Sequence, residues 1–246
     1  MERKKYRVIF FLVFISCLPF LCPGQRSEIY KAYVNNRMDI WKEVIDRMAV
    51  QNPESNEMIL ELVNYQYGYI GYCIGFKKRE EAKKYLALAE RNVEILEARN
   101  YDLSTINAYK CAFYGFRIGL NKLTAPVNGL KSIEHARTAL ALNRDNYLAH
   151  IQYGNIQFYM PSAFGGSKQE GIEYFLRARE ILERNRKDLT ENWNYLSLLV
   201  IIGQSYTYIN QPESAKAVYE EILNMEPGFS YVSNDLYPAL LKKMNT

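Results

Sequence analysis

Hydrophobic residues recur at helical spacing along nearly the whole chain from residue 25 onward. Separations of three and four residues place them on one face of a helix. An early example is the set Ile40, Val44, Ile45 and Met48. Pro53 then interrupts the pattern, and Ser55 is expected to cap the next helix. Residues 65–69 alternate like a strand, but both flanks keep helical spacing, so we predict a tyrosine-rich helix there.

The first 24 residues have the layout of a secretory signal: a short basic start, an apolar run, and small or turn residues before a polar segment. The apolar run, Val8 to Leu21, would span roughly 21 Å as a helix, less than the ~30 Å hydrocarbon core of a bilayer. We therefore expect cleavage after Gly24 and export of a mature chain that begins at Gln25. Lipoprotein processing at Cys17 and a retained membrane anchor are the alternatives.

A repeated pattern of small and large residues follows, and it is clearest between residues 199 and 227. Gly203 and Ala215 are small where two helices of a pair would meet, Tyr219 and Ile222 fill the space beside them, and Pro227 ends the second helix. This pattern resembles the tetratricopeptide repeat (TPR), a 34-residue helix–turn–helix unit. The resemblance implies an all-α, right-handed solenoid of helical hairpins, a scaffold that serves many unrelated partners.

The same pattern recurs upstream with insertions or in degenerate form, so the resemblance covers about residues 25–227. The upstream units open at Tyr67-Gly68, Tyr114-Gly115 and Tyr153-Gly154. The expected units are residues 25–54, 55–100, 101–145, 146–188 and 189–228. Residues 229–246 are expected to form a capping helix that starts or kinks near Pro238.

Charge and cysteine content exclude several classes of protein. The net charge is +4, but the first 24 residues hold four of the 31 basic and one of the 27 acidic side chains, so the rest is nearly balanced and shows no basic stripe for nucleic acid. Cleavage would leave Cys73 and Cys111. The repeat alignment places them roughly 10 Å apart in height on neighbouring helices, which favours two buried free thiols over a disulfide.

The TPR resemblance implies a concave groove lined by the first helix of each pair. In that register the groove carries aromatic, amide and hydroxyl side chains and no Lys or Arg, so a basic clamp for a partner's C-terminal carboxylate is not expected. Tyrosine-rich surfaces suit peptides or sugar-like ligands. The alternative is that a neighbouring helix packs on these aromatics and makes them core. The expected groove residues are Tyr65, Tyr69, Tyr72, Tyr109, Phe116, Asn155, Phe158, Tyr159, Gln204, Thr207 and Tyr208.

Candidate catalytic chemistry is sparse. His135 and His150 lack partners at metal-ligand spacing, so we interpret both as ordinary helix histidines and expect no metal or cofactor. The segment 164–168 lacks the spacing of a phosphate-binding loop; we expect Ser167 to cap a helix and Phe164 either to touch a ligand or to fold back onto the repeats. No hydrolase or zinc-protease motif is present.

These observations predict a non-enzymatic binding scaffold, exported to the bacterial envelope and periplasmic or secreted. The leading expectation is a protein or peptide partner held by the aromatic groove. The alternative is a small-ligand-binding accessory of a periplasmic solute-uptake system, which a closed pocket lined by Tyr65, Tyr109 and Phe158 would favour. An enzyme with a scattered site is the third possibility, and it would need titratable groups of perturbed pKa in a polar cleft.

Overall fold

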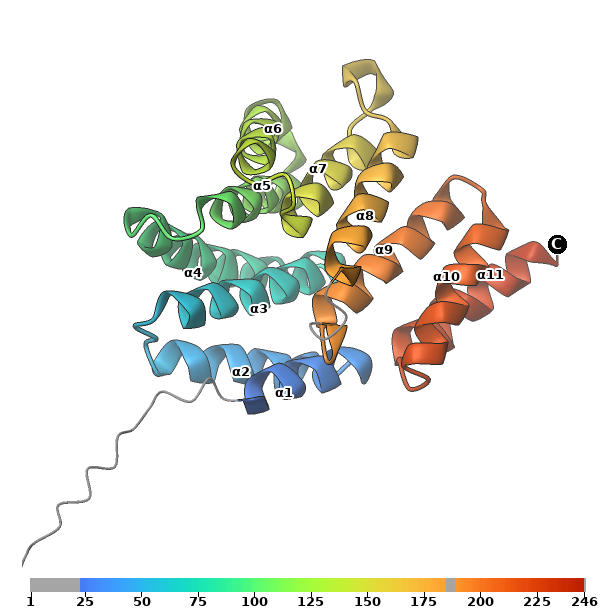
Figure 1. Ribbon diagram of the computed structural model, residues 1–246, viewed down its shortest axis with the longest axis horizontal. Helices are drawn as coiled ribbons and strands as arrows, with labels where there is room; N and C mark the ends of the chain where they lie inside the picture. The colour runs from blue at the N-terminus through green and yellow to red at the C-terminus, as the bar shows by residue number, and fades with distance from the viewer. Residues whose placement is uncertain (1–22, 185–188, 246) are drawn as a thin grey trace, which may run out of the picture.

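The computed structural model describes residues 23–184 and 189–245, and every regular element within these ranges is helical (Figure 1). The elements are α1 (Pro23–Val34), α2 (Met38–Val50), α3 (Asn56–Gly75), α4 (Arg79–Ala98), α5 (Leu103–Leu120), η1 (Lys122–Thr124), α6 (Ala125–Leu142), α7 (Tyr147–Tyr159), η2 (Ser162–Phe164), α8 (Lys168–Glu183), α9 (Trp193–Tyr208), α10 (Pro212–Met225), the π-helical turn η4 (Val232–Leu236) and α11 (Tyr237–Met244). The segment expected to be a signal peptide, with Cys17, lies outside the described residues, apart from Pro23 and Gly24 at the start of α1.

Side-chain caps fix several helix starts. The Ser55 hydroxyl accepts a hydrogen bond from the backbone N–H of Met58 at 3.2 Å, and α3 therefore begins directly after it. Ser167 accepts one from Glu170 at 3.2 Å and caps α8 in the same way. Both caps were expected from the sequence. Pro238 is the second residue of α11, which continues directly from the π-helical turn η4, so the helical stretch begins before the proline and the π-helical turn lies immediately ahead of it.

Successive helices pack as hairpins, α3 on α4, α5 on α6, α7 on α8 and α9 on α10 (Figure 1). Glycines let two of these pairs approach closely. A Cβ on Gly154 would lie 2.6 Å from the Phe175 ring, and one on Gly203 would lie 2.4 Å from the Tyr219 ring. Gly68 differs, because a Cβ there would meet Trp41 and Trp193 at 2.7 and 2.8 Å instead of a residue of α4.

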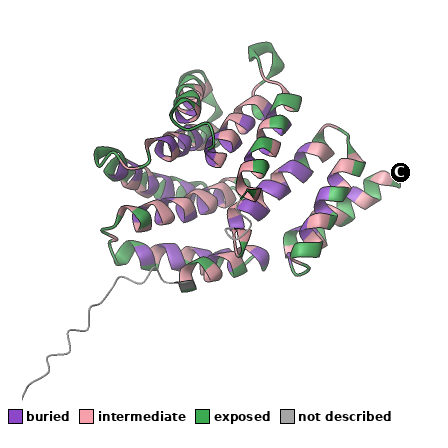
Figure 2. Ribbon diagram, in the orientation of Figure 1, coloured by how far each residue is buried: buried purple, intermediate pink, exposed green. Residues whose placement is uncertain are grey.

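Two hydrophobic clusters form the core, one from α1 to α7 together with Trp193 of α9 and one centred on α7 to α11 (Figure 2). Aromatic rings lie where they meet. The Trp41 and Trp193 rings are 4.9 Å apart and edge-to-face, and Tyr33 contacts both at about 6 Å. The indole N–H of Trp41 donates to the carbonyl of Tyr65 at 2.9 Å, so this buried polar atom is satisfied.

The first helix packs against the C-terminal part of the chain. The Tyr30 hydroxyl donates to Glu226 at 2.8 Å, the Ser230 hydroxyl donates to the carbonyl of Val34 at 3.1 Å, and the Tyr33 ring lies 5.0 Å from the Phe229 ring. These contacts join segments almost two hundred residues apart in sequence. The two ends of the described chain are therefore held together.

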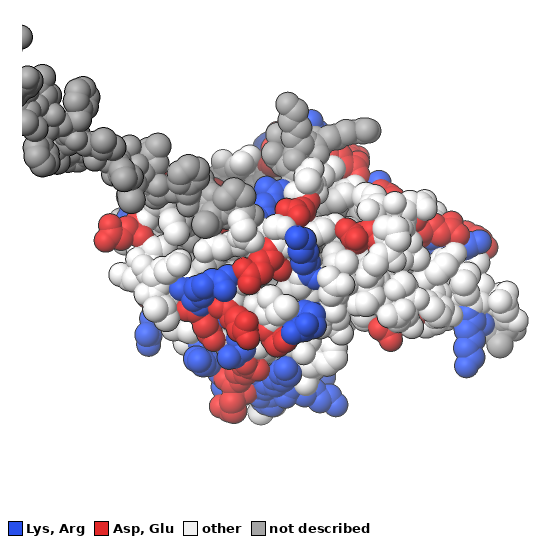
Figure 3. Space-filling view, turned by 90° about the horizontal axis from the view of Figure 1, so that it is seen from below, with Lys and Arg blue, Asp and Glu red and all other residues white. Residues whose placement is uncertain are grey.

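The surface carries both signs of charge. On the face seen in Figure 3, Lys and Arg alternate with Asp and Glu over the lower part, and a broad uncharged area lies beside them. Within the described ranges, no helix has both the length and the apolar character needed to cross a bilayer.

Candidate ligand-binding surface

Four of the eleven expected groove residues lie in the core. Tyr65, Tyr69, Tyr109 and Phe158 are all buried. The tyrosine hydroxyls reach polar partners at the edge of the core: Tyr69 donates to Glu81 at 2.9 Å and Tyr109 to Asn64 at 3.2 Å. Burial raises the pKa of both hydroxyls well above the usual range. These four side chains are corrected from ligand contacts to core residues.

The reason for this correction is the register of the glycines. Phe158 lies four residues after Gly154, on the same helix face, and that face packs on α8, where a Cβ on Gly171 would lie 2.8 Å from the Cβ of Phe158. In the first full hairpin, the Tyr69 ring lies 5.0 Å from Tyr85 of α4. Phe158 and Tyr69 therefore lie on faces that hold their own hairpins together, whereas Tyr109 of α5 packs on α3, with its ring 5.7 Å from that of Tyr67.

Three of the expected residues come together around a lysine that was not among them. Lys168 Nζ lies 4.9 Å from the ring centre of Phe158 and 5.1 Å from that of Tyr208, and it donates a hydrogen bond to the Phe158 carbonyl. The Phe158 ring is edge-to-face with Tyr159 at 5.2 Å and with Tyr208 at 5.4 Å. We call these four residues, Phe158, Tyr159, Lys168 and Tyr208, the Lys168 patch.

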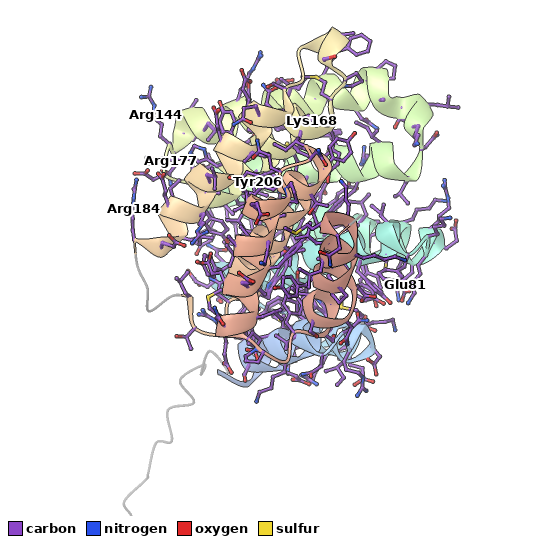
Figure 4. The ribbon with its side chains drawn as sticks, turned by 90° about the vertical axis from the view of Figure 1, so that its right-hand side faces the viewer. Glu81, Arg144, Lys168, Arg177, Arg184 and Tyr206 are labelled. Atoms are coloured by element: carbon purple, nitrogen blue, oxygen red, sulfur yellow. The ribbon has the colours of Figure 1, made fainter. Side chains whose placement is uncertain are left out.

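The patch is built where three helices end or begin. Met160 is extended and Pro161 follows, so α7 ends at Tyr159; α8 starts at Lys168, and α9 ends at Tyr208. The carbonyl groups at a helix C-terminus favour a nearby cation, which accounts for the position of the Lys168 ammonium. Figure 4 shows Lys168 at this end of α8, above Tyr206 of α9.

The patch presents aromatic surface and an unneutralised positive charge to solvent. Tyr159 is 74% exposed and Tyr208 is 68% exposed, while the Phe158 ring beneath them is buried. Lys168 is half-buried, and no carboxylate of the described residues forms an ion pair with it. Exposed rings around a partly desolvated cation form a surface suited to an anionic ligand with a flat apolar body.

Of the remaining groove candidates, Gln204 lies near the Lys168 patch, and Phe116 and Tyr72 lie in other clusters. Gln204 lies one helical turn before Tyr208, and its exposed amide donates to the Tyr231 hydroxyl at 3.1 Å. The Thr207 hydroxyl donates to the Gly203 carbonyl within α9. Phe116 stacks on Tyr67, and the Tyr67 hydroxyl accepts a hydrogen bond from the Gln152 amide. The Asn155 amide donates to the Gln152 side-chain oxygen at 3.5 Å. Tyr72 forms a separate cluster with Phe76 and Lys78 at the end of α3.

Phe164 stands at the tip of the loop between α7 and α8. The loop is tightly turned: Gly165 has a φ of +92°, and a Cβ on Gly166 would lie 2.0 Å from the Met160 carbonyl oxygen. Phe164 is 77% exposed, so it does not fold back onto the helices.

Two pockets lie away from the Lys168 patch, and neither is lined by Tyr65, Tyr109 or Phe158. The larger, of about 650 Å³, lies between α4, α5, η1 and α6. The smaller, of about 460 Å³, is lined by residues of α6, α7 and α8 together with Arg144, and includes Arg177, His150 and Tyr174. Figure 4 shows Arg144, Arg177 and Arg184 along one edge of the molecule, and Asp145 pairs with Arg177 and Arg184 at 3.5 and 3.0 Å.

The two cysteines of the described ranges lie in the core. Cys73 and Cys111 are free and buried, as expected, and burial raises their pKa values to about 11 and about 12, so both stay protonated at neutral pH. No group of three or more His, Cys, Asp or Glu side chains within residues 23–184 and 189–245 could hold a metal ion.

The environment of the His150 imidazole should make the stability of the fold depend on pH. Its Nε2 donates to the Arg144 carbonyl at 2.8 Å, which leaves Nδ1 unprotonated, buried and without a hydrogen-bond partner among the described atoms. Desolvation by burial lowers its pKa below the usual 6.5. The unfolded chain therefore takes up a proton first as the pH falls through about 6.5, and the folded state loses stability below that pH.

We expect the urea midpoint of unfolding to fall between pH 7.5 and pH 5.5, and to fall less in His150→Gln. Desolvation by burial also lowers the pKa of His135, so part of the dependence should persist in that variant. Equal pH dependence in the wild type and His150→Gln would contradict this assignment.

Comparison with known proteins adds a likeness of fold. No protein-family model matches the chain, and no curated protein matches it in sequence. Among solved structures, the chain is similar to the HusA haemophore from Porphyromonas gingivalis, with a TM-score of 0.60 and 15% sequence identity, over 75% of this chain and 90% of that chain. At this level of identity the similarity concerns the all-α fold alone.

Proposed function

We propose that this chain is a non-enzymatic binding protein that holds a flat, largely apolar, anionic ligand at the Lys168 patch. The observation that carries the proposal is the Lys168 ammonium, set between the Phe158 and Tyr208 rings without a carboxylate partner among the described residues. An anionic group of the ligand would pair with this ammonium, and its flat body would stack on the exposed Tyr159 and Tyr208 rings.

Haem is the ligand to test first. The structural neighbour is described as a haemophore, and haem combines a flat apolar macrocycle with two carboxylate side chains, which is the chemistry that the patch fits. The two histidines of the chain lie elsewhere, His135 beside Asn107 and His150 beside Arg144. Recognition at the patch would therefore depend on stacking and charge, and it should extend to the iron-free porphyrin.

A small ligand is therefore the first candidate and a peptide the second, which reverses the order expected from the sequence. The Gln204 amide and the Tyr231 hydroxyl, hydrogen-bonded to each other beside Tyr208, favour a peptide because they offer polar groups to a backbone. Gln204→Ala should weaken binding of a peptide and leave binding of a porphyrin unchanged.

Absorbance titration of residues 25–246 with haemin and with protoporphyrin tests the proposal. We expect Lys168→Gln and Tyr208→Ala each to weaken binding of both ligands by about tenfold, because the first removes the cation and the second a stacking ring. Tyr208 is exposed and Lys168 is half-buried, so the helical circular dichroism of both variants should match that of the wild type.

Lys78→Gln is the matched control, because Lys78 also lies over a tyrosine ring, that of Tyr72, at 4.9 Å but at the end of α3. Its affinity should equal that of the wild type. Wild-type affinity in both Lys168→Gln and Tyr208→Ala, or loss of binding in Leu123→Ser/Val127→Ser at the larger pocket, would overturn the assignment to the Lys168 patch.

We also infer the type of helical repeat and the compartment of this chain. The glycine-to-aromatic contacts at Gly154 and Gly203, repeated in two hairpins, support a TPR-type right-handed solenoid. We infer export to the bacterial envelope, with residues 1–24 removed as a signal peptide. The mass of the mature chain distinguishes a start at Gln25 from lipidation at Cys17.

A further inference from the structure

Helix α6 presents its large apolar side chains to solvent. Its buried positions are the small residues Ser132, Ala136 and Ala139. Val127 and Leu130, by contrast, are 62% and 71% exposed, and Leu123 in the preceding η1 turn is 88% exposed. The usual pattern of a surface helix is the reverse. Figure 2 shows α6 at the edge of the molecule, with many exposed residues.

The larger pocket lies directly beside these side chains. Its volume is about 650 Å³, and its lining includes Leu123 and Val127 together with the buried Leu86 of α4 and Leu120 of α5. The exposed residues are therefore one wall of a pocket whose floor is also apolar. The pocket is open to solvent on its outer side, so a ligand in it would keep part of its surface exposed.

Two cations, Lys83 and Arg117, and one acid, Glu90, also line this pocket. Arg117 contacts Glu90 through two of its nitrogens, at 3.0 and 2.8 Å, so other N–H groups of the guanidinium are available. Lys83 pairs with the highly exposed Glu80 at 2.7 Å, a surface ion pair of the kind that contributes little and exchanges readily. An anionic group of a ligand could bind both cations while an apolar chain fills the pocket.

We propose that the pocket between α4, α5 and α6 binds an amphiphile with one apolar chain and an anionic head. The chain lies against Leu86, Leu120, Leu123 and Val127, and the head lies at Arg117 and Lys83. The occupant is a free amphiphile; a lipid that stays within a bilayer is the alternative that the test separates from it. The site shares no residue with the Lys168 patch, so the outcome of one binding test does not decide the other.

Isothermal titration of residues 25–246 with dodecanoate, kept below its micelle concentration, tests the site. We expect one saturable site, at least tenfold weaker affinity in Leu123→Ser/Val127→Ser, and wild-type affinity in Val50→Ser, a control at another exposed apolar residue, on α2. Thermal unfolding should be unchanged in the double variant because both side chains are exposed.

The head group is tested with Arg117→Gln. This variant should lose about fivefold or more in affinity for dodecanoate but bind dodecyl maltoside, which has a neutral head, as the wild type does. No saturable binding of dodecanoate, or equal affinity in the double variant, overturns the proposal. Flotation with vesicles of phosphatidylglycerol separates the sources: vesicle binding without binding of free dodecanoate shows a membrane-facing surface and overturns the pocket.

Discussion

Replacing Tyr69 by alanine should lower the free energy of unfolding by about 3–5 kcal/mol. The Tyr69 ring is buried and lies 5.0 Å from the Tyr85 ring, and its hydroxyl donates to Glu81. Truncation leaves a cavity between α3 and α4 and removes an aromatic pair. Urea unfolding followed by circular dichroism measures the loss, and the folded variant should remain helical.

Tyr208→Ala is the control for this experiment because Tyr208 is mostly exposed. It should cost less than about 1 kcal/mol of stability, since its contacts are with the Phe158 ring and the Lys168 ammonium at the surface. Equal losses in the two variants would contradict the division of the expected groove tyrosines into core and surface residues.

Gly171→Ala should destabilise the fold although alanine is the better helix former. The α7 and α8 backbones approach so closely that a Cβ on Gly171 would lie 2.9 Å from the Gly154 carbonyl oxygen and 3.0 Å from the Phe158 backbone nitrogen. Backbone atoms cannot move aside as a flexible side chain can. We expect a net loss of about 1–3 kcal/mol in urea unfolding, typical of overpacking, after a gain of up to about 1 kcal/mol in helix propensity.

Gly115→Ala provides the matched comparison, because Gly115 also lies inside a helix but nothing would come within 4 Å of its Cβ. It should stabilise the protein by up to about 1 kcal/mol. The two substitutions are chemically identical and differ only in what surrounds them. Stabilisation in both would show that α7 and α8 are not held as closely as described.

Much of the helical arrangement could be predicted because its signals are local. Ser55 and Ser167 cap helices where the sequence places them, and the close contact of Gly203 with Tyr219 follows from small and large residues at fixed spacing. Each of these features depends on residues within one helix or one hairpin. Such short-range patterns can be recognised in a single sequence.

The binding surface was harder to predict because it depends on register between hairpins. Gly68 resembles Gly203 in sequence, yet it packs on Trp41 and Trp193 and not on its own partner helix. The register set by Gly203 therefore does not hold in the first full hairpin, where Tyr69 packs on Tyr85 of α4. Phe158 is buried although Gly154 keeps that register. Lys168 and Tyr208 are 40 residues apart, and no motif marks the lysine as part of an aromatic surface.

The contact between α1 and the C-terminal segment bears on how the chain reaches its folded state. In an open array of repeats, each unit could form as it is synthesised and unfold without disturbing distant ones. Here the contact between Tyr33 and Phe229 can form only after the long segment between them has been synthesised. Loop closure over such a distance slows folding. It also ties the fraying of either end to that of the other, so protection from hydrogen exchange in α1 and in residues 226–233 should rise and fall together.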